Sequence, residues 1–153
     1  MTPLLAKGSP LPETILDGPD GPVTLDQIRA GRPLVVAFYS EDATPTCSAQ
    51  LCAFRDDFVV IEELGAAFVG VSADSAESHA AFAAQHQFPF PLLADPDLDA
   101  AHAFGVVEEA TKRSLRAIFV SDADGTIVEA IPFYNPANGS QYQAVFVALG
   151  MEL

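Results

Sequence analysis

The chain has 153 residues, half of them hydrophobic and 18% charged, a balance typical of a folded globular protein that excludes an intrinsically disordered one. Seven Lys and Arg residues face 21 Asp and Glu residues, and the formal net charge of -14 makes nucleic acid and anionic membrane surfaces unfavourable partners. No stretch approaches the roughly 20 consecutive apolar residues that a membrane-spanning helix needs.

The length and the first residues of the chain predict one domain in the cytoplasm. A chain of 153 residues suits one compact domain, so residues 1–153 are expected to form a single unit. The first ten residues lack a basic region followed by an apolar one, so no secretory signal is expected. In the cytoplasm, two cysteines are more often catalytic or redox-active than structural.

The first expected elements are short β segments. Ile15-Leu16 and Val23-Thr24 flank a turn that is rich in Gly, Pro and Asp. Residues 34–39 form an apolar run of β-forming residues after Gly31-Arg32-Pro33, which predicts a buried strand.

A helix is expected over residues 45–64, with Pro45 suited to its first turn. The apolar stripe of this helix recurs every three or four residues and comprises Cys47, Leu51, Phe54, Phe58 and Ile61. Cys47 therefore shares the inward face with large apolar side chains, which are expected to shelter it from water.

The second half of the chain continues the alternation of β and α segments. Strands are expected at 66–72 and 90–94, and helices at 74–87 and 98–104. The helix over 74–87 is expected to contact the core through Ala80, Phe82 and Ala83.

A hairpin and a helix are expected to close the chain. Strands at 115–120 and 126–131 flank Asp122-Ala123-Asp124-Gly125, a strong hairpin turn, and a last helix is expected over about 140–149. The whole order predicts an α/β three-layer sandwich, with a central mixed β-sheet flanked by helices.

The two cysteines, Cys47 and Cys52, carry the clearest functional signal. Cys47 follows a buried strand and lies in the first turn of a helix, where unpaired N–H groups and positive partial charge favour a thiolate. A thiolate is the reactive form of cysteine, so Cys47 is the candidate nucleophile. Cys52 is the only other thiol.

The three histidines suggest no metal site. His79, His86 and His102 are expected on helix surfaces, and their spacings from the cysteines match no zinc pattern. The sequence therefore predicts neither a metal nor another cofactor.

A series of motifs occurs in the same order as in a known family. The motifs include Phe38-Tyr39, Thr44-Pro45, Cys47, Cys52, Phe54-Arg55-Asp56, Gly70-Val71-Ser72, Asp74-Ser75, Glu77-Ser78-His79, Phe88-Pro89-Phe90-Pro91-Leu92-Leu93 and Asp95-Pro96-Asp97. In this order the chain resembles the peroxiredoxins, and most closely the bacterioferritin comigratory protein or peroxiredoxin Q subfamily.

The resemblance implies a thioredoxin-like fold and a thiol-dependent peroxidase. Its substrates would be hydrogen peroxide and organic hydroperoxides, and its electrons would come from thioredoxin or a similar dithiol. It also implies a monomer or a weak homodimer.

The resemblance also implies roles for four residues. Cys47 would attack the peroxide and become a sulfenic acid, which Cys52 would convert to an intramolecular disulfide. The Thr44 hydroxyl would bind the peroxide. Arg116 looks like the active-site arginine of the family, and a permanent cation there favours both the thiolate and the departing oxygen.

Some residues around Cys47 depart from the family pattern. Ser40 stands where the family has proline, and Thr46 and Ser48 replace the usual Gly and Thr. Ser40 is expected to loosen the pocket and admit water. The carboxylates of Glu41 and Asp42, if close to Cys47, are expected to raise its pKa.

Two other functions remain open from the residues alone. One is a general thiol–disulfide oxidoreductase, although such proteins usually carry C-x-x-C and four residues intervene here. The other is a non-catalytic binding or holdase module of the thioredoxin fold. Peroxide consumption favours the peroxidase, insulin reduction favours the oxidoreductase, and neither result favours the binding module.

The spacing of Cys47 and Cys52 makes a structural prediction. In a continuous α-helix, residues five apart have Cα atoms roughly 8.7 Å apart, whereas a disulfide tolerates at most about 7 Å. The sequence therefore predicts an intact helix in the reduced protein and local unfolding when a disulfide forms.

Overall fold

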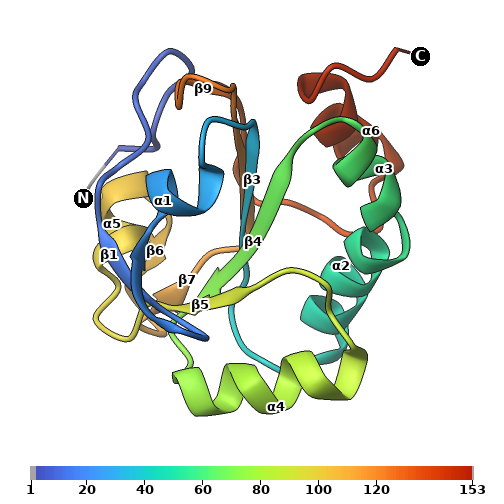
Figure 1. The fold of residues 1–153 in the computed structure, drawn as a ribbon. Coiled ribbons are helices and arrows are strands. Elements are labelled where there is room, and N and C mark those ends of the chain that lie inside the picture. The colour runs from blue at the N-terminus through green and yellow to red at the C-terminus, as the bar shows by residue number, and fades with distance from the viewer. Residues whose placement is uncertain (1–2, 153) are drawn as a thin grey trace.

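The computed structural model describes residues 3–152, which form a central mixed sheet covered by helices on both faces (Figure 1). The seven strands of the sheet lie in the order β2-β1-β5-β4-β3-β8-β9. They are β1 (Ile15–Gly18), β2 (Gly21–Thr24), β3 (Leu34–Phe38), β4 (Ala67–Ser72), β5 (Leu92–Ala94), β8 (Ala117–Ser121) and β9 (Ile127–Ile131).

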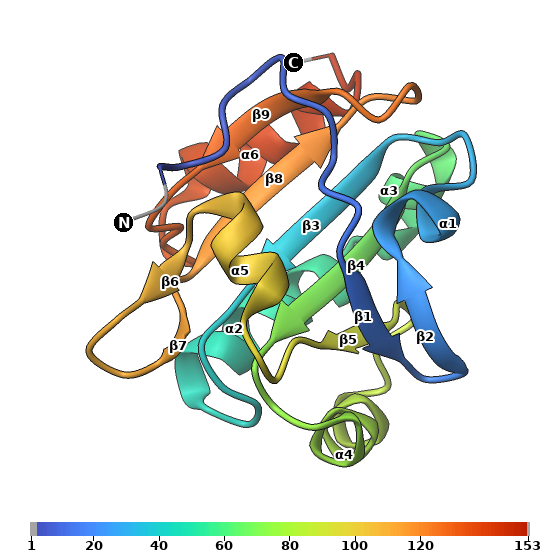
Figure 2. The same cartoon turned by 90° about the vertical axis from the view of Figure 1, so that its left-hand side faces the viewer.

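Six helices form the outer layers. They are α1 (Leu25–Arg29), α2 (Pro45–Asp56), α3 (Phe58–Glu63), α4 (Ala76–His86), α5 (Asp99–Phe104) and α6 (Gly139–Ala148). Helices α2, α3, α4 and α6 bury their apolar side chains against one face of the sheet, and α1 and α5 cover the other (Figures 1 and 2). This arrangement confirms the three-layer sandwich that the sequence predicts.

The sheet brings the ends of two strands together beside α2. Strands β3, β4 and β5 run parallel, whereas β8 runs antiparallel to β3. In this pairing Phe38, the last residue of β3, lies opposite Ala117, the first residue of β8. The chain that leaves β3 toward α2 and the chain that enters β8 therefore meet at one edge of the sheet.

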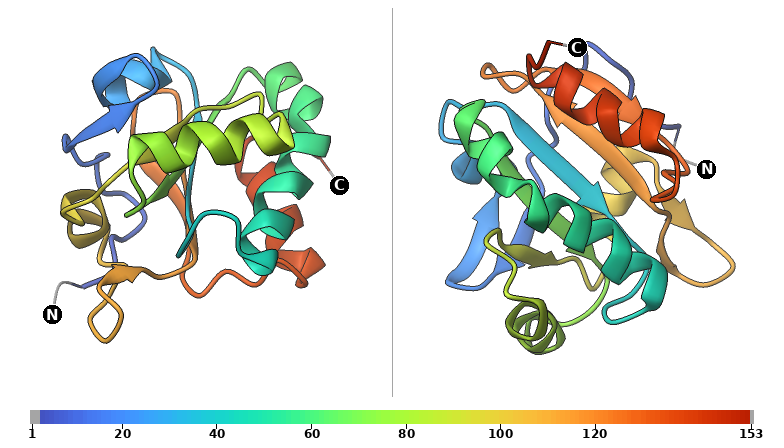
Figure 3. Two further views of the ribbon diagram at one scale, coloured as in Figure 1. Left: turned by 90° about the horizontal axis from the view of Figure 1, so that it is seen from below. Right: turned by 90° about the vertical axis from the view of Figure 1, so that its right-hand side faces the viewer.

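The helix expected over 45–64 is two helices, separated at Asp57. The Tyr142 hydroxyl of α6 lies 2.9 Å from the Ala53 carbonyl and 2.5 Å from Asp57 Oδ2. An inserted side chain that competes for a backbone carbonyl is a common cause of a helix break. The break leaves Ile61 buried, and Val59 is 60% exposed. Helices α2 and α3 run along the sheet beside α6 (Figure 3, right).

Two small elements were missed by the sequence reasoning. Helix α1 has only five residues, but a capping box marks its start, since the Thr24 hydroxyl accepts from Gln27 N and the Gln27 side chain accepts from Thr24 N. Strands β6 (Val107–Glu108) and β7 (Arg113–Ser114) form a separate hairpin. One expected core contact was wrong, because Ala80 of α4 is exposed.

No helix among residues 3–152 has the length and apolar character that crossing a bilayer requires.

Candidate active site

Cys47 lies in the first turn of α2, with its side chain fully buried. Thr44 is the N-cap residue in an extended conformation, and Pro45 follows in the first turn. The first bond of the helix runs from Ser48 N to the Thr44 carbonyl at 2.8 Å, so the N–H groups of Thr46 and Cys47 precede the hydrogen-bonded ladder. The expected position of a sheltered cysteine at a helix start is confirmed.

Arg116 reaches the thiol from the neighbouring strand. It directly precedes β8, and its Nη2 lies 2.9 Å from Cys47 Sγ. The pairing of Phe38 with Ala117 explains the contact, because it places Arg116 beside the chain that leaves β3. The structure therefore brings Arg116, Thr44 and Cys47 to one edge of the sheet, although they are far apart in the sequence.

Gln50 holds the Arg116 side chain in place. It is 1% exposed, its Oε1 accepts from Arg116 Nε at 3.0 Å, and its Nε2 lies 3.5 Å from the Phe38 carbonyl. Sequence reasoning missed this residue. A signal was present, because Gln50 lies three residues after Cys47, on the inward face of the helix, where a lone amide interrupts an apolar stripe.

Ser40 contacts the Cys47 thiol. Its Oγ lies 3.4 Å from Cys47 Sγ, and its carbonyl accepts from Arg113 Nη1 at 3.2 Å. A proline at this position would shield the thiol, whereas the serine offers it a hydrogen bond. The hydroxyl of Ser40 faces the sulfur, and the expectation that this serine admits water stays a prediction.

The surroundings of Cys47 lower its pKa. Burial acts to raise the pKa, but hydrogen bonds from Ser40, Thr44, the backbone of Glu41 and the Arg116 guanidinium outweigh it. The environment therefore favours the thiolate, the form of cysteine that attacks an electrophile.

We predict that Ser40→Ala makes the Cys47 thiolate less stable while the contact of Cys47 with Arg116 stays in place. The pKa of Cys47 should rise, and the rate of the reaction with peroxide at neutral pH should fall about tenfold, as expected for the loss of a hydrogen bond to a charged group worth about 1.5 kcal/mol. The titration of the thiol by its ultraviolet absorbance measures the first effect and stopped-flow kinetics the second. An unchanged titration of the Cys47 thiol would show that Ser40 does not stabilise the thiolate. Ser9→Ala, in the N-terminal segment, is the matched control.

The Thr44 hydroxyl does not cap α2, although Thr44 is the N-cap residue of this helix. Its hydroxyl accepts no bond from α2 and lies 3.2 Å from the Glu41 carbonyl. A hydroxyl carries one proton, which can turn from that carbonyl to the Cys47 sulfur or to a bound oxygen. Its position next to the thiol fits the peroxide-binding role that the resemblance implies.

Asp42 and His79 form a buried pair that anchors the loop before α2. His79 Nδ1 lies 2.8 Å from Asp42 Oδ2, its Nε2 lies 3.1 Å from the Leu93 carbonyl, and the two side chains are 3% and 5% exposed. Tyr39 and Ser78 also donate to the Asp42 carboxylate, at 2.6 and 2.7 Å. The expectation of a surface position was therefore wrong for His79, because a loop 37 residues away supplies its partner.

The carboxylates of Glu41 and Asp42 do not oppose the thiolate. The Asp42 side chain is bound by His79, and that of Glu41 lies 3.5 Å from the Arg113 guanidinium. The expected increase in the Cys47 pKa from these groups is therefore not found.

The Asp42–His79 pair predicts an acid-sensitive contribution to stability. Burial raises the pKa of Asp42, but hydrogen bonds from His79, Tyr39 and Ser78 outweigh it, and the net pKa is lowered. A carboxyl with a lowered pKa stabilises the fold above the pKa of an unfolded Asp, about 3.9, and loses this contribution as the pH falls through the folded value.

Asp42→Asn should therefore lower the free energy of unfolding by about 3–5 kcal/mol at pH 7, as breaking a buried pair does. The difference between wild type and variant should shrink below about pH 4. Urea unfolding at pH 7 and pH 3 measures both values. A difference of the same size at both pH values contradicts the prediction, and Asp20→Asn, in the exposed β1–β2 turn, is the control.

Cys52 lies in the same unbroken helix as Cys47, and both thiols are free. Cys52 is partly exposed and contacts α4, where its Sγ lies 3.5 Å from His86 Nδ1. The prediction of an intact helix between two free thiols is confirmed. Among the described residues, Cys52 forms no hydrogen bond to Thr44, Cys47 or Arg116.

A small cavity is lined by residues that contact the thiol. It has a volume of about 270 Å³ and is lined by Ser40, Ser114, Leu115, Arg116 and Phe133, among others. Two of these residues, Ser40 and Arg116, contact the Cys47 sulfur directly. Within residues 3–152, no group of three or more His, Cys, Asp or Glu side chains is arranged to hold a metal ion.

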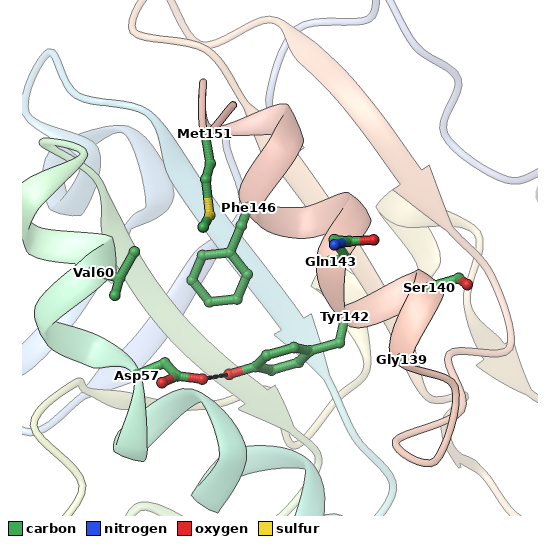
Figure 4. A pocket seen from close by; sticks show the side chains of 8 residues that line it. All are labelled: Asp57, Val60, Gly139, Ser140, Tyr142, Gln143, Phe146 and Met151. Atoms are coloured by element: carbon green, nitrogen blue, oxygen red, sulfur yellow. Dashed lines mark hydrogen bonds between the residues drawn. The ribbon is translucent and has the colours of Figure 1, made fainter. Parts of the chain in front are cut away.

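A larger cavity of about 610 Å³ lies at the other end of α2, between α3 and α6 (Figure 4). Asp57, Tyr142, Phe146 and Met151 line it, and the bond from Tyr142 to Asp57 crosses its floor. None of the lining residues contacts Cys47, so this cavity is separate from the thiolate site.

Comparison with known proteins agrees with this geometry. A family model described as the AhpC/TSA family matches residues 8–130. The chain is 45% identical over 103 residues to a chloroplastic peroxiredoxin Q of Sedum lineare, covering 67% of this chain and 55% of the relative. It is 33% identical over 130 residues to peroxiredoxin Bcp of Bacillus subtilis, covering 80% and 82%. The chain spans about half the length of the plant relatives it matches.

Solved structures show the same fold. Peroxidoxin BcpB from Mycobacterium tuberculosis superposes with a TM-score of 0.86 at 28% identity, covering 94% of this chain and 96% of that one. Peroxiredoxin Q from Xanthomonas campestris gives 0.81 at 30% identity, covering 97% and 96%. The fold is therefore thioredoxin-like, and the chain belongs to the AhpC/TSA family and, within it, to the peroxiredoxin Q and Bcp group.

Proposed function

We propose that this protein is a thiol-dependent peroxidase that reduces hydrogen peroxide and organic hydroperoxides with the Cys47 thiolate. The observation that supports it best is a buried sulfur at a helix start, 2.9 Å from a guanidinium. A structural relative from Xanthomonas campestris, a bacterioferritin comigratory protein 30% identical to this chain, is described by its alkyl peroxide reduction activity.

The first step forms a bond between sulfur and oxygen. The Cys47 thiolate attacks one peroxide oxygen, the O–O bond breaks, and the sulfur becomes a sulfenic acid. The departing oxygen takes up a proton and leaves as water or an alcohol. Arg116 stabilises its developing negative charge, and the Thr44 hydroxyl together with the free N–H groups of the first turn holds the peroxide in line.

The second step forms the Cys47–Cys52 disulfide. The Cys52 sulfur attacks the Cys47 sulfenic acid, the S–O bond breaks, and water leaves. A dithiol such as thioredoxin then reduces the disulfide. Because both cysteines lie in one continuous helix, α2 has to rearrange before the two sulfur atoms can meet.

The contacts of α2 indicate which half of it rearranges. The C-terminal half is tied to its neighbours by bonds that do not involve the thiols, since Arg55 Nη1 donates to the His86 carbonyl at 2.9 Å and Tyr142 contacts the Ala53 carbonyl. In the N-terminal half, Gln50 bonds to the Arg116 guanidinium, and Cys47 contacts the same guanidinium. Oxidation to a neutral sulfenic acid removes the negative charge of that contact.

We predict that amide hydrogen exchange rises on oxidation in residues 48–50, the first amides bonded within α2, and stays protected in residues 53–56. The disulfide form should lose the first turns of α2 and retain the part anchored by Arg55 and Ala53. Exchange measured by mass spectrometry on reduced and oxidised protein tests this. Equal protection of residues 48–50 in both states, with the disulfide confirmed, contradicts the local unfolding.

We also propose that the protein works in the cytoplasm as a monomer or weak homodimer. The high negative charge of the protein opposes tight self-association, which supports the proposed monomer or weak homodimer. Sedimentation of the reduced protein measures the oligomeric state.

Stopped-flow consumption of hydrogen peroxide by the reduced protein tests the function directly. A rapid burst of one equivalent per protein molecule supports the peroxidase. Insulin reduction without peroxide consumption replaces the proposal with a thiol–disulfide oxidoreductase, and the absence of both activities replaces it with a binding module.

A further inference from the structure

The side chain of His86 faces the thiol of Cys52, a contact that the peroxide step does not use. His86 is the last residue of α4, and its Nδ1 lies 3.5 Å from Cys52 Sγ, which is hydrogen-bond distance for sulfur. In the tautomer that carries its proton on Nε2, Nδ1 presents a lone pair to the thiol. The contact therefore places a base beside the second cysteine.

The imidazole is held in this orientation by aromatic neighbours. The ring of His86 stacks on Phe88, with centroids 5.4 Å apart and planes 21° apart, and it meets Phe82 edge-on at 5.1 Å. The carbonyl of His86 accepts from Arg55 of α2 at 2.9 Å, which ties the end of α4 to the turn that follows Cys52. Both partners are therefore fixed relative to each other.

The surroundings suit a group that gains a proton for a short time. The C-terminal end of a helix carries negative partial charge, and His86 lies at that end of α4. The charged side chain that faces this end of α4 from α2 is that of Arg55, which lies 2.9 Å from the Asp56 carboxylate. The positive charge of Arg55 is thereby partly balanced.

We propose that His86 is the general base that deprotonates Cys52 when the disulfide forms. An ordinary thiol is only a few per cent ionised at neutral pH, so an adjacent base speeds its attack. His86 takes the proton of the Cys52 thiol as the S–S bond forms and the S–O bond of the Cys47 sulfenic acid breaks. His86 holds that proton as an imidazolium, and the departing hydroxide takes up a proton from solvent and leaves as water, so atoms and charges balance without another reactant.

The same pair serves the reverse proton transfer. When a dithiol attacks the disulfide at Cys47, Cys52 leaves as a thiolate, and the imidazolium returns the proton to it. The inference rests on the proposed function, because it assigns a role in the resolution step. It also requires Cys52 to stay beside α4 while Cys47 moves, as the anchored C-terminal half of α2 allows.

The test compares wild type with His86→Gln, which keeps a polar side chain of similar size but has no base. Reduced protein is mixed with one equivalent of hydrogen peroxide and quenched with acid at set times, and the disulfide is measured by intact mass after alkylation. His102→Gln is the matched control, because His102 is exposed on α5, on the opposite face of the sheet.

We expect an unchanged peroxide burst and disulfide formation about 10²-fold slower in His86→Gln at pH 7, the lower range for the loss of a general base. The deficit should shrink as the pH rises, because hydroxide then ionises the thiol, and added imidazole should restore part of the rate. A purely structural role would give slow disulfide formation at every pH and no rescue. That result, or a wild-type rate in the variant, overturns the inference.

Two further readouts keep the test decisive. If His86→Gln fails to fold, His86→Asn, which also lacks a base, is measured in the same way. If wild type itself forms no Cys47–Cys52 disulfide, the proposed resolution step fails. If the disulfide forms at the wild-type rate in His86→Gln, His86 is not the base, and the proposed resolution by Cys52 is unaffected.

Discussion

Replacing Cys47 with Ser should abolish peroxide consumption, whereas Cys52→Ser should show the rapid consumption of one equivalent and then no catalytic turnover. Only Cys47 has a buried sulfur that a guanidinium and two hydroxyl-bearing residues surround. Cys52 lies against α4, partly exposed, and makes no such contacts. Without Cys52 the sulfenic acid at Cys47 has no internal thiol to condense with, so it persists or oxidises further to sulfinic acid.

Stopped-flow kinetics with reduced protein and excess peroxide measures both variants. Circular dichroism shows whether each remains folded, which matters because Cys47 is part of the core. If a folded Cys52→Ser lacked the first turnover while Cys47→Ser kept it, the roles of the two cysteines would be reversed.

Replacing Arg116 with Ala should slow the peroxide step by about 10²-fold or more, the effect of losing one well-placed donor to a developing oxyanion. The guanidinium contacts the sulfur at 2.9 Å and lines the small cavity of about 270 Å³, so we expect it to act on both the thiolate and the departing oxygen. The pKa of Cys47 should rise at the same time, because a hydrogen bond that lowers it is lost.

Stopped-flow kinetics and titration of the thiol give the two readouts for Arg116→Ala. Arg32→Ala is the control, since Arg32 bonds only to the backbone carbonyls of Ile28 and Arg29 near α1, on the other face of the sheet. Gln50→Leu should give a smaller effect of the same kind, because it frees the arginine without removing it. A normal rate and a normal titration in Arg116→Ala would exclude Arg116 from the site.

Much of the fold could be predicted because its signals are local. The apolar run before Pro45 predicts a strand followed by a helix start, and this alone places Cys47 at the edge of the sheet. The turn at residues 122–125 likewise predicts the hairpin of β8 and β9. Arg116 could not be found by spacing, because the pairing of two distant strands brings it to the thiol; only the family resemblance identified it.

The missed features share a physical cause, which is contact between distant segments. The helix break at Asp57 depends on Tyr142, 85 residues later, and the burial of His79 depends on Asp42, 37 residues earlier. Neither contact can be predicted from the helical periodicity of the sequence. Ser40 was interpreted through the loss of a proline ring, but the backbone of this loop turns its hydroxyl toward the sulfur.

The central claim is that Cys47 is the thiolate that receives the peroxide oxygen, and mass spectrometry of Cys52→Ser tests it most directly. After treatment with one equivalent of hydrogen peroxide, the reduced variant should gain one oxygen atom, and fragmentation should localise that oxygen to Cys47. Wild type treated in the same way should instead lose two hydrogen atoms and carry a Cys47–Cys52 disulfide. An unmodified Cys47, or oxygen found only on another residue, would contradict the account.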